Sequence, residues 1–509
     1  MKSFFAYFGV ATALVAIVCA LSQYVYDGDN FYHLGHAMLY AEKGPFFRSF
    51  PWPAYSVISK HNSDLWWGFH LLLTPLALLK DKVLILAVAP GVLMVLNLLI
   101  SRLAVIRLGM NQWYGLALLP ASLGFLSRMD TVRPQALSAA LLILLFAAIV
   151  SEAPWLAILT SALIGFLHPT LSYLIAMVGF CTFLQRRISK KGWNPWLELS
   201  CLMVALTVSC IRPGMIDGLQ LMKIQLVDLT FVRRAGEVKN FGVELDRVNF
   251  GYFNRAYLGP LITVGVALLC FLRFRDPEKK AWAVWGALGV VALSFAISLL
   301  LTRRGADQFA PFAILASLCI FHQCKGISKF TAVAFSLYSL TITGMFLNSS
   351  FQRKVRYNAA DFQRGTEWLK AHTEEGEIVG HGVWSDFGPL FFWNPHNRYL
   401  GGMDPVFQYR FNPETYWLMT VNCAARDLGK TSKFNPAIVG DKEEDLSVAW
   451  PRDLKTKWLF CASDWNVELQ SELKKDKNTR IAYQDSHVII FEFLPTNPIG
   501  GSGTALSGQ

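Results

Sequence analysis

Charged side chains are scarce in this sequence, and their scarcity sets the class of protein. Asp, Glu, Lys and Arg make up 16% of the 509 residues, while 53% of the residues are hydrophobic. A soluble globular protein carries about 25% charged residues. The composition therefore excludes an ordinary soluble protein and indicates a polytopic membrane protein. The formal net charge of +11 does not indicate a nucleic-acid partner, because Lys and Arg stand in short clusters between apolar runs, as topology signals do.

Two kinds of catalytic centre are also missing from the sequence. The nine cysteines show no metal-ligand spacing. Seven of them fall in or beside apolar runs, namely Cys19, Cys181, Cys201, Cys210, Cys270, Cys319 and Cys324. No Ser, His and Asp set accompanies a nucleophile-elbow glycine pattern, so hydrolysis through an activated serine is not supported. The first apolar run, Phe4 to Leu21, has no small-residue cleavage site after it, which favours a retained transmembrane helix with a cytoplasmic N-terminus.

A short apolar segment, Leu65 to Leu79, decides the predicted topology. It has about fifteen residues, fewer than the roughly twenty that a transmembrane helix needs. If this segment crossed the membrane, every later basic cluster, such as Arg186-Arg187 with Lys190-Lys191, would lie outside. If it lies in the membrane interface, these clusters fall on the cytoplasmic side, as the positive-inside rule favours.

With the interfacial assignment, the sequence predicts about eleven transmembrane helices. They are Phe4–Leu21, Val83–Ser101, Trp113–Leu126, Gln135–Val150, Pro154–Leu167, Thr170–Leu184, Pro195–Ile211, Leu258–Leu272, Ala281–Leu301, Phe309–Phe321 and Phe330–Leu347. The same topology places residues 23–82, 127–135, 212–256 and 302–308 on the outer face, together with His168 and Pro169. Polar groups from distant parts of the transmembrane domain, residues 1–347, therefore converge on one surface.

After Leu347 the composition changes to that of a soluble domain, and the odd number of helices puts residues 348–496 outside the cytoplasm. Helical periodicity in Ala359–His372 and buried-strand patterns predict a small α/β domain. The predicted strands are Glu377–Val383, Trp458–Cys461 and Val488–Phe493. A disulfide between Cys423 and Cys461 is left open. Residues 497–509, rich in Gly and Ser, are predicted to form a flexible tail.

The candidate active centre lies just after the first apolar run. Asp27, Asp29 and His33 follow one another within seven residues there. Acidic side chains at the edge of a bilayer are costly to desolvate and are usually kept for a site. The alternative is that Asp27 to Asn30 form only a turn and a helix cap, since Asp, Gly and Asn favour both.

Other outer loops carry further candidates. Asp130 and Arg133 stand together in the second loop, where Arg can bind a phosphate in a bidentate fork; the alternative is a salt bridge at a helix end. Arg303 and Arg304 lie on the outer side, against the charge rule, which suggests an anionic partner such as a lipid phosphate or, more simply, headgroup anchoring.

The first loop resembles that of the GT-C superfamily of membrane glycosyltransferases, which use polyprenyl-phosphate-linked sugars. The resemblance is carried by the segment Asp27 to His33 and extends through Phe50-Pro51-Trp52, Asp64 to Trp67 and Met129 to Pro134. It implies a bundle of transmembrane helices with an acidic residue of the first loop at the catalytic centre, and Asp130 at the acidic position of the second loop.

The predicted outer domain is similar to oligosaccharyltransferase catalytic subunits around their Trp-Trp-Asp-Tyr-Gly motif. Here the matching residues are Trp384 to Gly388, with Ser385 in place of the second Trp and Phe387 in place of Tyr. In those enzymes the motif helps to hold the acceptor peptide. The two departures favour an acceptor other than a peptide. The polar turn that ends in Asp404 could face the same cleft or be a loop capped by that residue.

The resulting hypothesis is a glycosyltransferase of a bacterial inner membrane. Asp29 is assigned as the base with Asp27 beside it, and Asp130 as a third acid. The residues predicted to bind substrate are His33, Arg133, His168, Arg303, Arg304, Trp384, Asp386 and Asp404. Arginines, or a Mg²⁺ or Mn²⁺ ion held by Asp27, Asp29 and Glu244, would neutralise the departing phosphate; Glu237 is a weaker candidate ligand.

The expected partners are a polyprenyl-phosphate-linked sugar, membrane lipids, and a glycan, lipid or protein acceptor. Two alternatives remain at this point. One is protein glycosylation of the oligosaccharyltransferase kind. The other is a transporter of lipid-linked saccharides, which is less favoured because the predicted spans carry almost no charge and the acids lie at one rim.

Overall fold

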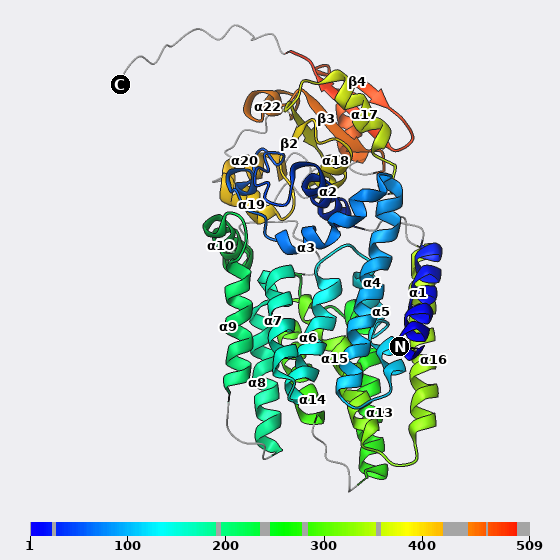
Figure 1. The fold of residues 1–509 in the computed structure, drawn as a ribbon. Helices are drawn as coiled ribbons and strands as arrows, with labels where there is room; N and C mark the ends of the chain where they lie inside the picture. The colour runs from blue at the N-terminus through cyan, green and yellow to red at the C-terminus, as the bar shows by residue number, and fades with distance from the viewer. Residues whose placement is uncertain are drawn as a thin grey trace. The chain divides into compact units, whose positions relative to one another are not determined.

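The chain divides into two units, which are described separately. The computed structural model describes residues 2–22, 27–189, 195–234, 245–276, 283–352, 358–420, 446–464 and 467–495. A helical unit comprises Met1–Ser49 and His61–Ala359, and a sheet unit comprises Phe50–Lys60 and Ala360–Gln509 (Figure 1). Residues 497–509, Cys423, Glu237 and Glu244 lie outside the described residues, so the predictions made for them are not addressed by the structure.

Long apolar helices dominate the helical unit. By length and composition, five helices of the described residues could cross a membrane: Lys2–Leu21, Lys82–Arg107, Phe250–Phe274, Arg303–His322 and Ser328–Ser350. The bent pair Trp196–Cys210 and Met215–Val232, with an angle of 113°, would make a sixth. Helices suit a bilayer because each satisfies its backbone hydrogen bonds internally. The predicted number of eleven spans stays a prediction, since several of the remaining apolar helices are short.

The helices and short helical turns of this unit follow one another along the chain with these bounds: α1 Lys2–Ser22, α2 Gly28–Lys43, α3 Trp67–Leu73, η2 Thr74–Leu79, α4 Lys82–Arg107, η3 Gln112–Leu118, α5 Leu123–Met129, α6 Gln135–Val150, α7 Pro154–Leu167, η4 Pro169–Leu171, α8 Tyr173–Ile188, α9 Trp196–Cys210, α10 Met215–Lys223, η5 Ile224–Asp228, α11 Leu229–Arg234, α12 Phe250–Phe253, η7 Asn254–Leu258, α13 Gly259–Phe274, α14 Val284–Leu300, η8 Arg303–Gly305, α15 Ala306–His322 and α16 Ser328–Gln352.

Helices α6 and α15 form the centre of the helical unit. Nearly every residue of both is buried, and they contact each other, with α4 and α7 beside α6 and α13 and α14 beside α15 (Figure 1). A helix that is apolar all round belongs in an interior. The outer helices instead expose large apolar side chains, such as Trp155 at 84% and Leu272 at 82%, as expected of a lipid-facing surface. Gly165 lets α7 approach α9, because a Cβ there would lie 2.3 Å from the Ala205 carbonyl oxygen.

Two predicted segments are broken in the structure. Trp113–Leu126 is not one helix: η3 ends at Leu118 and α5 begins at Leu123, because Pro120 lies between them and Ser122 caps α5. The predicted single span is therefore wrong in form. The segment Leu65–Leu79, which is predicted to lie in the membrane interface, contains α3 and the 3₁₀ helix η2, with Pro75 at the start of η2.

The sheet unit is built on a five-stranded sheet of order β2-β1-β3-β5-β4. Its elements are η1 Val57–Lys60, α17 Gln363–His372, β1 Ile378–His381, η9 Trp384–Asp386, α18 Phe387–Trp393, β2 Arg398–Tyr399, α19 Pro405–Phe411, α20 Pro413–Thr420, α22 Leu446–Asp453, β3 Trp458–Ala462, α23 Val467–Leu473, β4 Thr479–Gln484 and β5 Val488–Phe493. Strand β1 runs parallel to β2 and β3, while β5 runs antiparallel to β3 and β4. The predicted α/β fold of this part is confirmed.

Both faces of the central strands are covered. On one face, Phe460 of β3 packs against Phe362 just before α17, with ring centroids 4.8 Å apart. On the other, Leu459 and Phe491 join the core cluster that contains Trp450 of α22. This double coverage explains why β3 and β5 are almost continuously apolar rather than alternating.

Phe50–Lys60 belongs to the sheet unit, although the sequence placed it within the outer loop 23–82 of the transmembrane domain. Tyr399 of β2 donates its backbone N–H to the Trp52 carbonyl at 2.8 Å, and Ala54 returns a bond to the Tyr399 carbonyl at 2.7 Å. The predicted boundary after residue 347 also moves, because α16 continues to Gln352 and the helical unit ends at Ala359.

Candidate functional site

The acidic motif of the first loop forms the start of helix α2. Asp27 is the N-cap: its Oδ1 accepts from the Asp29 backbone N–H at 3.1 Å. The alternative interpretation of the motif as a helix cap is therefore right for Asp27. The cap leaves the other carboxylate oxygen of Asp27 available for a second contact, and the helix fixes Asp29 in its first turn.

Arg133 joins the two carboxylates. One guanidinium nitrogen, Nη2, lies 2.5 Å from Asp27 Oδ2 and 2.9 Å from Asp29 Oδ2. The loops that carry them are also docked through the backbone, because Val132 donates its N–H to the buried Asn30 side chain at 2.7 Å. The side chains of Asp27 and Asp29 stay 26% and 28% exposed, so solvent or a substrate can reach them. The structure thus brings together three predicted site residues from two loops.

The acid pair in this arrangement does not fit a bridging divalent cation. A Mg²⁺ or Mn²⁺ ion would have to lie between the two carboxylates, where the Arg133 nitrogen already contacts both. The third predicted ligand, Glu244, is outside the described residues. At this pair the positive charge therefore comes from the Arg133 guanidinium and not from a cation. Asp130, the predicted third acid, is buried at the C-cap of α5.

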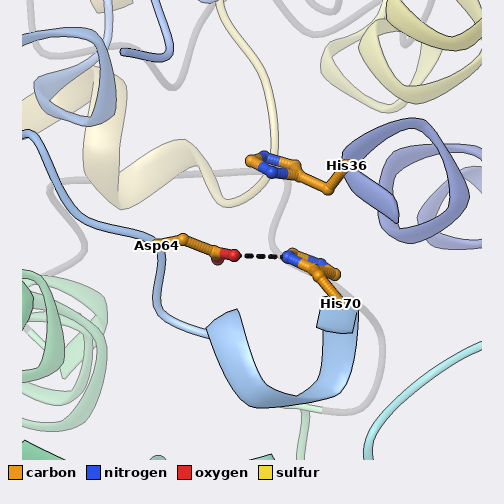
Figure 2. Close-up of side chains that lie close together, drawn as sticks. All are labelled: His36, Asp64 and His70. Atoms are coloured by element: carbon orange, nitrogen blue, oxygen red, sulfur yellow. Dashed lines mark hydrogen bonds and ion pairs between the residues drawn. The ribbon is translucent and has the colours of Figure 1, made fainter. Parts of the chain in front are cut away.

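Further along α2, polar side chains form a buried network with the segment that follows. His33, His36 and Tyr40 repeat at helical spacing after Asp29, which puts them along one side of the helix. His70 Nδ1 lies 2.5 Å from Asp64 Oδ2 (Figure 2). Tyr40 donates its hydroxyl to the same oxygen at 2.8 Å. The other ring nitrogen of His70, Nε2, lies 2.7 Å from His33 Nδ1.

Burial sets the protonation states in this network. It lowers the pKa of His36 to about 3, with a further contribution from His70, and it lowers the pKa of His33 well below its usual range. Burial alone would raise the pKa of Asp64, but the neighbouring His70 and His36 and the hydrogen bonds from His70 and Trp66 outweigh it, so that pKa lies below its usual value. The network therefore holds the neutral imidazoles of His33 and His36 near the Asp64 carboxylate.

The start of the loop after α9 holds the Asp64 segment in place. Arg212 donates from Nη1 to the Leu65 carbonyl at 2.8 Å, and Asp217 accepts the Asn62 backbone N–H at 2.9 Å. Gly214 is required at this contact: its φ is +68°, and a Cβ would lie 2.1 Å from the Asn62 carbonyl oxygen.

The other predicted basic residues of the helical unit have different surroundings. Arg303 donates to the Arg247 carbonyl at 2.8 Å and lies 3.9 Å from Asp246, so it is held by the end of the preceding outer loop. Burial lowers the pKa of His168 to about 3, and the positive charge of Arg304 makes a smaller contribution in the same direction. His168 Nδ1 lies 2.8 Å from the Ser138 hydroxyl. Arg304 and His168 are thus neighbours from two predicted outer loops.

Three predicted site residues lie in the sheet unit. Trp384 and Asp386 form the turn η9 after β1, with Trp384 half-buried and Asp386 buried. Asp404 caps α19 by accepting the Val406 backbone N–H at 3.3 Å, as the alternative interpretation expected. Cys461, whose pairing was left open, is a buried free thiol.

The network of His36, Tyr40, Asp64 and His70 was not predicted from the sequence. Asp64 was named only as part of a resembling segment. The histidine spacing on α2 was a usable signal, because His33 and His36 with Tyr40 fall on one side of a helix. Their pairing with Asp64 and His70, more than twenty residues later, depends on tertiary structure.

Comparisons with known proteins find a similarity in fold and none in sequence. No family model matches the sequence, and no curated protein matches it. Two solved structures of ArnT from Cupriavidus metallidurans are similar. The one bound to undecaprenyl phosphate has 12% identity and a TM-score of 0.56, and the apo form has 10% identity and a TM-score of 0.52. Each comparison covers 96% of this chain and 98% of ArnT. The similarity shows an ArnT-like fold over nearly the whole chain, which agrees with the predicted helical fold class, and the apolar helices are those of an integral membrane protein.

Proposed function

We propose that the protein transfers a sugar from a polyprenyl-phosphate-linked donor to an acceptor on the outer face of a bacterial inner membrane. The observation that carries the proposal is the partly exposed group of Asp27, Asp29 and Arg133 at the start of α2. Two further points support it: the ArnT-like fold, and the undecaprenyl phosphate bound in one ArnT structure.

In this proposal Asp29 takes the acceptor proton. The acceptor oxygen or nitrogen attacks the anomeric carbon, the bond from that carbon to the phosphate oxygen breaks, and the polyprenyl phosphate leaves with the bonding electrons. Asp27 already accepts a capping hydrogen bond as well as the Arg133 contact. Asp29 is therefore the better candidate for the base, with Asp27 and Arg133 positioning it.

The departing phosphate needs positive charge or hydrogen-bond donors. Arg133 contacts two carboxylates, so its charge is largely balanced. Arg303 is held by the loop that contains Asp246 and Arg247. We assign the phosphate to Arg304 with His168 beside it, because these two come from different outer loops and act on each other electrostatically.

The acceptor in this proposal is a glycan or a lipid rather than a peptide. Ser385 stands where oligosaccharyltransferases have a second Trp. A Trp buries roughly 150–250 Å², so a peptide pocket without it would be much weaker. Protein glycosylation is the outcome that would replace this part of the proposal.

The test uses purified full-length protein in lipid nanodiscs, with undecaprenyl-phosphate-linked radiolabelled sugars as donors. The acceptor is either a cell-envelope glycolipid fraction or a sequon peptide. Sugar should pass to the glycolipid fraction, and Asp29→Asn should abolish transfer. Asp81→Asn is the control for the substitution itself, because Asp81 is an exposed acid at the start of α4 to which the proposal gives no role. Transfer to the peptide would favour protein glycosylation, and no transfer from any donor, with intact protein, would contradict the proposal.

A further inference from the structure

A buried group of metal-ligating side chains lies beyond the acid pair on α2. His36 comes from α2, Asp64 from the following loop and His70 from α3 (Figure 2). One ligand atom from each lies within 4.8 Å of the ligand atoms of the other two. Among the described residues, no other three His, Cys, Asp or Glu side chains come this close together. His70 is fully buried, and the side chain of Asp64 is 7% exposed.

The donor set is selective. Two imidazoles and one carboxylate are the protein ligands of catalytic zinc sites, and they also suit iron, whereas Mg²⁺ and Ca²⁺ prefer oxygen ligands throughout. A tetrahedral zinc keeps its ligand atoms about 3.4 Å apart, given bonds of about 2.0–2.1 Å. The contact between His70 Nδ1 and Asp64 Oδ2, now 2.5 Å, would therefore open by about 1 Å, and the wider separations, which lie within 4.8 Å, would close by roughly 1 Å. We propose that His36, Asp64 and His70 bind one divalent transition-metal ion, with zinc as the best match.

The residues around the group already hold its ligands in orientation, as in established metal sites. Tyr40 donates to Asp64 Oδ2, and the Trp66 backbone N–H donates to Asp64 Oδ1 at 2.9 Å. His33 lies 2.7 Å from Nε2 of His70, the nitrogen that faces away from Asp64. Each of the two ligands thus has a second partner that fixes how it points.

Metal binding would exchange the hydrogen-bonded contact between His70 Nδ1 and Asp64 for coordination, while Nε2 of His70 would keep its contact with His33 Nδ1. The ion would replace a hydrogen-bonded contact by three coordinate bonds, and it would join α2, the loop at Asp64 and α3.

The site would fix the helix that carries the proposed base. His36 lies two turns of α2 after Asp29, so an ion bound to His36, Asp64 and His70 would hold α2 against α3. This consequence rests on the proposed function, but the binding of metal does not.

The experiment measures metal and uses no sugar substrate, so its result is independent of the proposed function. Full-length protein with an affinity tag other than polyhistidine is stripped with a chelator, dialysed against Zn²⁺ alone and analysed by mass spectrometry of the metal. We expect about one zinc per chain, and a loss of at least about fivefold in His36→Gln, Asp64→Asn and His70→Gln. His61→Gln and His372→Gln, which alter histidines outside the group, should keep the metal.

A second variant guards against simple misfolding. With Co²⁺ in place of Zn²⁺, His36→Cys should gain a thiolate-to-cobalt charge-transfer band that the wild type lacks, which requires residue 36 to touch the metal. Size-exclusion profiles establish that each variant is folded. A monodisperse wild type without bound zinc would overturn the proposal and leave a hydrogen-bonded chain from Asp64 through His70 to His33. Retention of zinc by all three ligand variants, or a His36→Cys spectrum identical to that of the wild type, would overturn it equally.

Discussion

Helix α2 places polar side chains in opposite surroundings at its exposed start and, two turns later, in its buried middle. At its start, Asp27 and Asp29 are about one quarter exposed and share one guanidinium. Two turns later, His36 and the neighbouring Asp64 and His70 are buried among aromatic side chains, with His33 and His70 rings 5.0 Å apart. An exposed acid with a charged partner can exchange protons with a substrate. A buried group of imidazoles and a carboxylate can instead hold the backbone or a metal.

This contrast separates activity from stability within one element. Contacts at the exposed end are partly screened by water, so their loss should alter the free energy of unfolding only modestly. In the buried middle of α2, around His36 and Tyr40, a polar group left without its partner suffers the full desolvation penalty. Variants of the exposed acids should therefore change the rate more than the stability. Variants of the buried group should change the stability more than the rate.

The largest expected effect is that of Asp29→Asn on transfer. An amide keeps the size and polarity of the side chain but is no useful base, so we expect a loss of about a hundredfold or more in kcat. The melting temperature should stay within a few degrees of the wild type, because the exposed pair contributes little to folding. Radiolabel transfer and a thermal melt of the same preparation measure both. Full activity in a stable Asp29→Asn protein would remove Asp29 from the mechanism.

Asp64→Asn should show the opposite pattern. The amide nitrogen would face donors that now contact the carboxylate, Tyr40 and His70, so about 2 kcal/mol of stability should be lost. Chelator in the buffer keeps metal from contributing. The measurement is the free energy of unfolding from denaturant titration in detergent, beside Asp217→Asn as a control on a more exposed acid. Equal losses in the two variants would mean that burial does not distinguish the two regions.

The sequence predicted the parts of the fold that rest on local pattern. Helices α6 and α7 and strand β5 have the predicted bounds, because each is an apolar run between clear breaks. Strand β4 was missed: it lies at the sheet edge, is partly exposed and carries Arg480, so it lacks a buried-strand pattern. Strand β2 has two residues and cannot show any period.

The candidate site divides in the same way. Asp27 and Asp29 could be found from their place at the membrane edge, and Arg133 from its place in the next outer loop. The sequence could not predict that a single nitrogen of Arg133 contacts both acids, because this contact depends on the docking of Asn30 against Val132. The pairing of α2 with Asp64 and His70 likewise arises only when the chain is folded.

Arg133→Gln tests whether the guanidinium positions the acids. It removes the shared positive charge and leaves two carboxylates close together, so we expect a fall of about tenfold in kcat with a smaller change in KM. Steady-state kinetics with the lipid-linked donor measure the split. Arg128→Gln is a control in the same loop, because Arg128 pairs with Asp307 instead. If KM rose and kcat did not change, Arg133 would bind substrate rather than position the base.

The smallest effect, and the finest test of the contrast along α2, is that of Tyr40→Phe. The change removes one hydroxyl that donates to the Asp64 carboxylate at 2.8 Å. A hydrogen bond to a charged acceptor contributes more than one to a neutral acceptor. The matched control is Tyr338→Phe, because Tyr338 donates at 2.6 Å to the neutral Ala121 carbonyl in the same unit. We expect Tyr40→Phe to lower the free energy of unfolding by about 1 kcal/mol more than the control does, with kcat within about twofold of the wild type. Equal losses in the two variants would mean that the Asp64 carboxylate is not charged in the folded protein. A large loss of kcat in Tyr40→Phe would mean instead that the buried middle of α2, around His36 and Tyr40, takes part in the reaction.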